Sequence, residues 1–209
     1  MESLFPLLKP RKKTIVLAAL ATALLTVALS FIQPLKYSAS IRLQITQRAA
    51  FTLDPYTAIR STELIGENLA QLIATSSFLD RVLQTGYKID QRYFTLPETQ
   101  RRRLWSRTVE ARQVRGKGFL DVQVFHPARE EALKIVAAIS FLLSTQGSDY
   151  IGRDIIVRLV DAPLASRFPV RPNLPLNAVV GVLVGAVLGS GWVWIEHRRK
   201  KHHGRLLDS

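Results

Sequence analysis

The sequence predicts an α+β extracytoplasmic domain, a small sheet with helices on one face, between two transmembrane helices. Residues 14–32 and 176–195 are uncharged, and no other apolar run is long enough for a span. At about 1.5 Å of rise per residue, each can cross a hydrocarbon core of roughly 30 Å. Strand and helix periodicities alternate in the insert between them, which favours a single mixed domain.

The charges that flank the two runs predict their orientation. Basic residues close to a span stay in the cytoplasm, so residues 1–13 and 196–209 are expected to be cytoplasmic. A cleaved signal peptide is the competing interpretation, but the first run is long for a signal core, and bulky Phe31 and Ile32 stand where cleavage needs small residues. The flanking basic residues are Lys9, Arg11, Lys12, Lys13, Arg198, Arg199, Lys200, Lys201 and Arg205.

The formal net charge is +13, and nine of the 29 basic residues lie in these two flanks. The insert, residues 33–175, holds 20 basic and 13 acidic residues. A mildly basic domain outside the cytoplasm favours lipid phosphates or an anionic polymer as a partner, rather than nucleic acid. The chain has no cysteine, which excludes a disulfide framework and thiolate metal sites.

The predicted domain, residues 33–168, begins with a strand that a helix follows. Apolar and polar residues alternate from Tyr37 to Thr46, as in a half-buried strand. The pattern then changes to helical spacing. The apolar residues at that spacing are Leu64, Ile65, Leu69, Leu72 and Ile73.

Two capping patterns predict the starts of two further helices. Ser77 with Asp80, and Thr95 with Glu98, each place a hydroxyl three residues before a carboxylate. The first pattern would start a helix that Gly86 ends, and the second a short helix rich in arginine.

A hairpin, a long helix and a last strand complete the domain. Within residues 107–125, two strand-like segments flank "RGKG", where Gly116 and Gly118 can adopt the positive φ of a tight turn. Pro127 is expected to start the long helix. Residues 154–163 form the last strand, which should neighbour the first because each leads directly to a span. The long helix carries Glu130 and Glu131 in its first turn and an apolar face of Ala132, Ile135, Val136, Ile139, Leu142 and Leu143.

A proline segment leads out of the domain. Pro169, Pro172 and Pro175 are three residues apart, which matches the three residues per turn of polyproline II. Residues 169–175 are therefore expected to form a stiff, extended stalk that sets the distance from domain to bilayer. The alternative is a simple proline-rich stop between a strand and a span.

The second span carries a glycine stripe. Gly181, Gly185 and Gly189 form GxxxGxxxG, which allows a second helix to approach closely. That helix is either the first span, which has alanines at 18, 19, 21, 23 and 28, or a span of a neighbouring subunit.

No catalytic constellation is visible, so the chain is predicted not to be an enzyme and to need no cofactor or metal. His126 is interpreted as the residue before a helix start. "RGKG" lacks the residues of a phosphate loop, and adjacent Glu130 and Glu131 do not face each other on a helix. The histidines of the basic tail favour a patch that contacts lipid over a metal site.

Arginines of the predicted basic helix are the candidates for contact with glycan or phosphate, and a solvated helix face is the simpler interpretation. They are Arg101, Arg102, Arg103 and Arg107. Trp105 beside them can stack on a sugar ring, but a lone tryptophan on a helix is more often part of a core.

Four segments, in this order, resemble the chain-length determinant (Wzz-type) polysaccharide co-polymerases, and most closely their short members, the membrane adaptors of capsule and exopolysaccharide systems. They are the N-terminal span, "PLKYSASIRLQI", "GFLDVQVFHPAREEALKIVAAI" and "IIVRLVDAPLASRFPVRPNLPLNAVVGVLVGAVLG". The chain departs from the family at Val136, Ala137 and Ala138, where members often have "IAN". Its insert is also too short for the long helical arm of the large members.

The resemblance implies a homo-oligomer of the bacterial inner membrane that regulates the length, polymerisation or export of a capsule, exopolysaccharide or O-antigen. It implies a polymerase or export complex as a partner. The 14 residues after Ile195 leave no room for a fused tyrosine kinase, so a kinase would be a separate protein. The rival interpretation is a tethered extracytoplasmic sensor of a small ligand, or an adaptor that recruits such a kinase.

Overall fold

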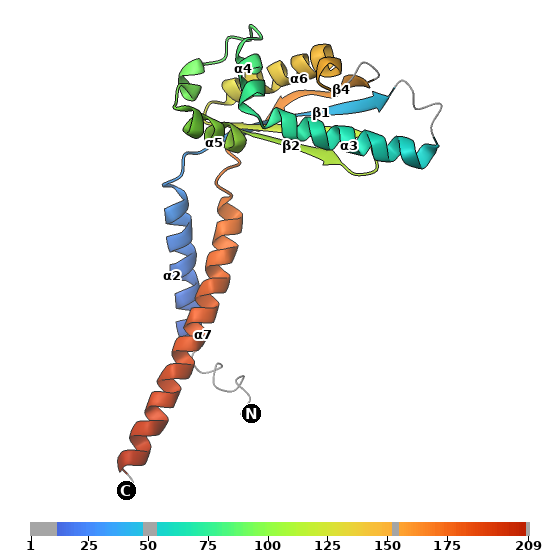
Figure 1. Cartoon of the computed structure of the whole chain (residues 1–209). Coiled ribbons are helices and arrows are strands. Elements are labelled where there is room, and N and C mark those ends of the chain that lie inside the picture. Colours follow the sequence, from blue (N-terminus) through green and yellow to red (C-terminus); the bar gives the residue numbers. More distant parts are fainter. Residues whose placement is uncertain (1–11, 48–53, 152–154, 208–209) are drawn as a thin grey trace. The chain divides into compact units, whose positions relative to one another are not determined.

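The computed structural model describes residues 12–47, 54–151 and 155–207, and the chain divides into two compact units (Figure 1). The span unit consists of residues 1–35 and 171–209. The sheet domain consists of residues 36–170.

The sheet domain is built on a four-stranded antiparallel sheet in the order β2-β3-β1-β4. The strands are β1 (Tyr37–Gln47), β2 (Val109–Val114), β3 (Phe119–His126) and β4 (Ile155–Ala165). The prediction that the first and last strands are neighbours is confirmed. Tyr37 pairs with His126, and Ala39 pairs with Ala165. We call this end of the sheet the attached end, because the chain arrives from one apolar helix and leaves for the other there; the opposite end is the free end.

Helices cover one face of this sheet, in agreement with the predicted α+β class. They are α3 (Pro55–Ile73), α4 (Ser76–Leu83), the 3-10 helix η3 (Gln91–Phe94), α5 (Glu98–Thr108) and α6 (Arg129–Ile151). In β1, Ala39, Ile41, Leu43 and Ile45 are buried against the helices, whereas Ser40, Arg42, Gln44 and Thr46 are exposed on the other face. Alternation along one strand therefore separates the core from solvent, as the sequence predicted.

Among the described helices, α6 contributes the most buried residues to the core of the sheet domain. All six residues of its predicted apolar face are buried, and the helix packs against β1, β3 and β4. It begins at Arg129, two residues after Pro127. In its first turn Glu131 accepts a hydrogen bond from the backbone N–H of Asp90 at 2.9 Å and pairs with Lys134 at 2.7 Å.

Helix α3 begins earlier than its apolar spacing indicates. Asp54 caps it by accepting hydrogen bonds from the N–H groups of Tyr56 and Thr57, and Pro55 occupies the first turn. Aspartate before proline is a typical helix start that the apolar pattern alone did not reveal. Leu69 and Ile73 are buried as predicted, but Leu64 is about half exposed.

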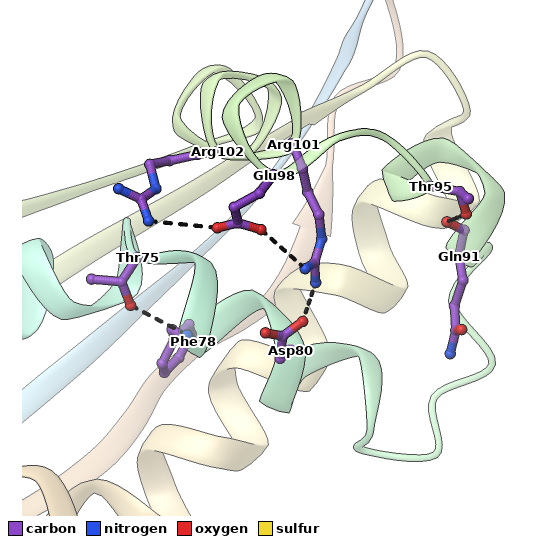
Figure 2. Close-up of polar contacts among 8 residues, drawn as sticks. All are labelled: Thr75, Phe78, Asp80, Gln91, Thr95, Glu98, Arg101 and Arg102. Carbon is purple, nitrogen blue, oxygen red and sulfur yellow. Dashed lines mark hydrogen bonds and ion pairs between the residues drawn. The ribbon is translucent and has the colours of Figure 1, made fainter.

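Both predicted capping patterns are wrong in position (Figure 2). The cap of α4 is Thr75, whose hydroxyl accepts the N–H of Phe78 at 3.2 Å, while Ser77 lies inside the helix. The start at Ser76 turns the apolar residues Phe78, Leu79 and Val82 into the core, which decides between the two hydroxyls.

The cap of α5 is Pro97, and its side chain makes no cap hydrogen bond. Thr95 instead donates its hydroxyl to the carbonyl oxygen of Gln91, at the end of η3 (Figure 2). The Thr95 hydroxyl therefore stabilises the 3-10 helix η3, which the sequence did not predict, and does not cap α5. In the β2–β3 hairpin, Gly116 and Gly118 have φ of +73° and +59°, as predicted for this turn.

Residues 169–175 do not form the predicted extended stalk. The N–H of Val170 donates to the carbonyl oxygen of Lys36 at 2.8 Å, which ties the segment to the residue before β1. Pro175 already lies in the first turn of the helix that begins at Leu174. A proline fits the first helical turn because the N–H that it lacks has no partner there. Pro169, Pro172 and Pro175 therefore do not share one extended segment.

The span unit contains α2 (Lys12–Ser30) and α7 (Leu174–Leu207), which pack side by side (Figure 1). α2 and the part of α7 from Leu174 to Glu196 are long and apolar enough to cross a membrane. α7 continues as a helix through residues 197–207, where the sequence predicted only a basic tail.

Candidate functional site

The glycine stripe of α7 lies against α2 of the same chain. A Cβ atom built on Gly185 would lie 1.9 Å from Thr22 Oγ1 and 2.6 Å from the Ala18 carbonyl oxygen. At Gly181 it would lie 2.7 Å from the Ala23 Cα, and at Gly189, 3.1 Å from the Ile15 Cα. Of the two partners that the sequence left open, the structure places the first span against the stripe.

A row of polar side chains joins the same two helices. Thr22 Oγ1 lies 2.8 Å from the carbonyl oxygen of Gly181, and Thr26 Oγ1 lies 3.1 Å from that of Asn177. Asn177 donates its side-chain N–H to Ser30 Oγ at 2.7 Å. Hydrogen bonds between membrane helices stabilise a pair by about 0.6 kcal/mol each on average. Close backbone approach and these bonds together fix the register of the two helices.

The sequence analysis missed this polar row. Thr22, Thr26 and Ser30 follow one another at intervals of four residues, which places them on one face of a helix. That spacing was the available signal. The remaining surface of the pair is apolar and exposed. Its large exposed side chains include Leu17, Leu24, Leu29, Leu183, Val187 and Leu188.

Two of the four candidate arginines are committed to ion pairs within the sheet domain. Arg101 pairs with Asp80 of α4 and, at 3.6 Å, with Glu98, and Arg102 reaches Glu98 at 3.5 Å (Figure 2). Asp80, predicted to cap α4, therefore joins α4 to α5 instead. Arg103 and Arg107 are exposed, and no ion pair of theirs is found among the described residues. They are four positions apart and so lie on the same side of α5.

Trp105, beside these arginines, belongs to the core. Its side chain is fully buried, and its indole N–H donates to the carbonyl oxygen of Ile73 at 2.8 Å. The Phe94 ring lies edge-on to it, with the ring centroids 5.9 Å apart. The indole is therefore not available to stack on a sugar, and the core interpretation of this residue is the correct one.

His126 acts at a helix start, as predicted. Its Nδ1 accepts the N–H of Ala128 at 3.0 Å, just before α6, and its ring packs edge-on against Tyr93 with centroids 4.3 Å apart. Burial lowers the pKa of His126, against the opposing influence of nearby Glu131. Burial also raises the pKa of Tyr93. The neutral imidazole is thus the form that the folded domain favours.

This preference makes the stability of the sheet domain depend on pH. In the unfolded chain the histidine pKa is about 6.5, so below that pH the unfolded state binds more protons. We expect the unfolding midpoint in urea to fall as the pH drops from about 7 through 6.5 and further toward the lowered pKa. In His126→Asn the amide oxygen can accept the same N–H without titrating, so the fall between about pH 7 and 5 should shrink. An equal fall in both proteins would contradict this role.

The exposed face of the sheet carries a shallow cleft of about 590 Å³. Arg42 lines this cleft and donates two hydrogen bonds to the Asp121 carboxylate, at 2.6 and 2.8 Å. The hydrogen bonds to Asp121 and the negative charge of its carboxylate raise the pKa of Arg42. The charges of this pair neutralise each other, and Asp161, which also lines the cleft, leaves it with an excess negative charge. Among the described residues, no group of three or more His, Cys, Asp or Glu side chains is placed to hold a metal ion.

The chain was compared with known protein families and proteins. Residues 1–85 match the family described as Wzz, chain length determinant protein. The matched part covers α2, β1, α3 and α4. Among curated proteins, no relative matches the chain. Over residues 1–85, this match supports the family resemblance that the sequence predicted.

Proposed function

We propose that this chain, whose residues 1–85 match the Wzz chain length determinant family, belongs to that family and is a homo-oligomeric scaffold that regulates a bacterial surface polysaccharide. The regulated step is the length, the polymerisation or the export of a capsule, an exopolysaccharide or an O-antigen. The family match is the observation that carries the proposal. This match supports a role for the chain in determining polysaccharide chain length.

We place the protein in the inner membrane with both termini in the cytoplasm and the sheet domain outside. Two helices long enough to span, one on each side of the domain in sequence, support this topology. So do the basic residues on the outer flank of each run. Because α2 packs closely against α7, the two spans of each subunit would move together as one unit.

The proposed mechanism is geometric, because no catalytic group is needed to set a length. Several sheet domains assemble into a ring beside a polymerase or export complex, and the ring limits how long the growing chain stays engaged. The glycine stripe is already occupied by α2 of the same chain. Subunit contacts would therefore use the sheet domain or the outer, apolar surface of the span pair.

Arg103 and Arg107 are the residues that we propose contact the glycan or its lipid-linked pyrophosphate. Both are exposed on one side of α5, whereas Arg101 and Arg102 have carboxylate partners. Arginine binds phosphate and carboxylate groups through two parallel hydrogen bonds. The roles of the four arginines would then differ, with Arg101 and Arg102 holding the helices in place.

A second candidate function, an adaptor for a separate cytoplasmic tyrosine kinase, is favoured by the length of α7. The helix extends through residues 197–207, beyond the apolar window that ends at Glu196. A helix that continues past the bilayer offers a regular surface for a docking protein.

The test is complementation of a deletion strain, read as the length distribution of the surface polysaccharide on gels. We expect deletion to abolish the preferred length and the wild-type gene to restore it. Arg103→Glu with Arg107→Glu should shift the preferred length, because the charge at the contact is reversed. Arg115→Glu with Lys117→Glu, the same charge change on the exposed β2–β3 turn, is the matched control and should behave as wild type.

Light scattering in mild detergent gives the mass of each variant and keeps the outcomes apart. All should share one discrete oligomeric mass. An unchanged length distribution in the deletion strain would reject the function. A monomeric wild type would reject the ring and favour the ligand sensor. Equal effects of the two charge reversals would reject the contact at Arg103 and Arg107.

A further inference from the structure

The end of β4 and the segment that follows it expose large apolar side chains. Leu164 is 72% exposed and Phe168 is 70% exposed, and Val170 is exposed as well. The Arg167 guanidinium lies over the Phe168 ring, 5.6 Å from its centroid. An exposed aromatic ring with a cation stacked on it has one apolar and one charged part at the same place on the surface.

Hydrogen bonds hold this segment on the attached end of the sheet domain. The backbone of Ser166 donates to the Ser38 carbonyl oxygen at 2.7 Å, and its hydroxyl accepts the Ser38 N–H at 3.0 Å. Arg129 donates to the Ser166 carbonyl oxygen at 3.2 Å. Val170 is bonded to Lys36, as described above. The exposure of Phe168 therefore belongs to an ordered segment with two fixed ends.

Only a short stretch of sequence separates this segment from the second span. Phe168 is six residues before Leu174, where α7 begins. Six residues of fully extended chain span at most about 20 Å, and Ser30, the last residue of α2, is equally close in sequence to Lys36. The linkers that join the attached end of the domain to the two spans are therefore both short in sequence.

The chemistry of the segment fits the interface of a bilayer. Aromatic rings are enriched at the level of the lipid headgroups, and arginine side chains keep their charge there beside the phosphates. Basic residues are attracted to an anionic lipid surface. Arg129 and Lys36 add positive charge at the same end of the domain, where Glu131 and Asp90 supply negative charge near His126.

We propose that residues 164–170 are a membrane-contact segment, with Leu164 and Phe168 in the headgroup layer of the outer leaflet and Arg167 bound to lipid phosphate. The proposal rests on the two-span topology proposed above. This contact would set the distance between the sheet domain and the bilayer, the role that the sequence analysis gave to the polyproline stalk. The same chain thereby holds its domain at the membrane by two spans and by a surface contact.

The test uses tryptophan fluorescence of the full-length protein in vesicles of phosphatidylcholine and phosphatidylglycerol, with brominated lipid as the quencher. Trp192→Phe with Trp194→Phe leaves Trp105, buried in the core, as background. Phe168→Trp is then added. The matched control is Tyr56→Trp, because Tyr56 is also an exposed aromatic residue, 78% exposed, but lies on the first turn of α3. That end of α3 is at the free end of the sheet, where Gln47 is bonded to Ser61 at 2.7 Å.

We expect brominated lipid to quench the indole introduced at position 168 at least about twofold, and the one introduced at position 56 not at all. Adding Arg167→Gln should reduce the quenching at position 168. An indole at position 168 that aqueous iodide reaches and brominated lipid does not would overturn the proposal. One that neither quencher reaches would overturn it as well and would indicate a contact with a neighbouring subunit.

The natural tryptophans of α7 separate this proposal from its premise. In the protein that keeps Trp192 and Trp194, brominated lipid should quench both, because they lie in the apolar window of α7. If it does not, the second span is not in the bilayer and the proposal falls with it. If it quenches these residues but not the indole at position 168, the spans stand and only the membrane-contact segment is rejected.

Discussion

Gly185→Leu should force α7 away from α2, whereas Gly191→Leu in the same helix should leave the pair intact. At Gly185 even a Cβ atom would lie 2.6 Å from the Ala19 Cα, which is backbone and cannot rotate away. At Gly191 a Cβ atom would meet nothing within 4 Å. Both changes add the same four-carbon side chain to the same span, so any difference comes from the contact with α2.

The measurement is a disulfide cross-link, which the absence of natural cysteines makes clean. A Cβ atom on Gly189 would lie 3.1 Å from the Ala18 Cβ, slightly less than the roughly 3.5–4.5 Å of a disulfide. A shift of a few tenths of an ångström between the helices would bring Ala18→Cys and Gly189→Cys into range, so the pair should cross-link within one chain. Overpacking costs about 1–3 kcal/mol, and 1.4 kcal/mol is tenfold in an equilibrium constant. We therefore expect Gly185→Leu to reduce the cross-linking rate about tenfold and to abolish the preferred polysaccharide length.

The position of the cross-link also decides what the stripe does. A covalent dimer on gels would mean that the stripe joins two subunits, contrary to the pairing within one chain. Equal cross-linking in the Gly185 and Gly191 variants would mean that the close approach at Gly185 does not hold the helices together. A lost cross-link with normal polysaccharide length would mean that Gly185 holds the two helices together but that length control does not depend on their pairing.

The glycine stripe illustrates what a sequence does and does not determine. The spacing of Gly181, Gly185 and Gly189 indicated a close helix contact, but the partner depends on how two distant segments meet. The contacts of the stripe with α2, including the hydrogen bonds from Thr22 and Thr26 to carbonyl oxygens of α7, identify the first span as that partner. In the domain, alternation along β1 and the apolar face of α6 were predictable because periodicity directly reports which side is buried.

The starts of α4 and α5 were not predictable from local pattern. Thr75 and Ser77 are both good caps in isolation, and the choice follows from burying Phe78 against the core. Asp80 could have taken part in the cap of α4, but its carboxylate forms an ion pair with Arg101 of α5 instead. The proline segment failed for a related reason, since Pro175 suits a helical first turn as well as an extended stalk. In each case a residue had two competent local roles and tertiary contacts selected one.

Trp105→Ala should lower the unfolding temperature of the sheet domain more than any change on its surface. The indole is fully buried, and truncating a buried tryptophan costs about 3–5 kcal/mol. The change also removes the donor to the Ile73 carbonyl oxygen, which joins the end of α3 to α5. For a domain of this size we expect a fall of roughly 10–20 °C in the midpoint, measured by circular dichroism in detergent.

Two further substitutions separate the parts of this effect. Trp105→Phe keeps an aromatic ring but leaves the Ile73 carbonyl oxygen without its donor, so a smaller loss of about 1–3 kcal/mol is expected. Trp192→Ala, which removes the same side chain from an exposed position on α7, should not change the midpoint of the domain. If Trp105→Ala instead leaves the midpoint unchanged and alters only polysaccharide length, the indole acts on the glycan and its assignment to the core is wrong. If stability and length fail together in Trp105→Ala and recover in parallel in Trp105→Phe, the folded domain itself is what the length control requires.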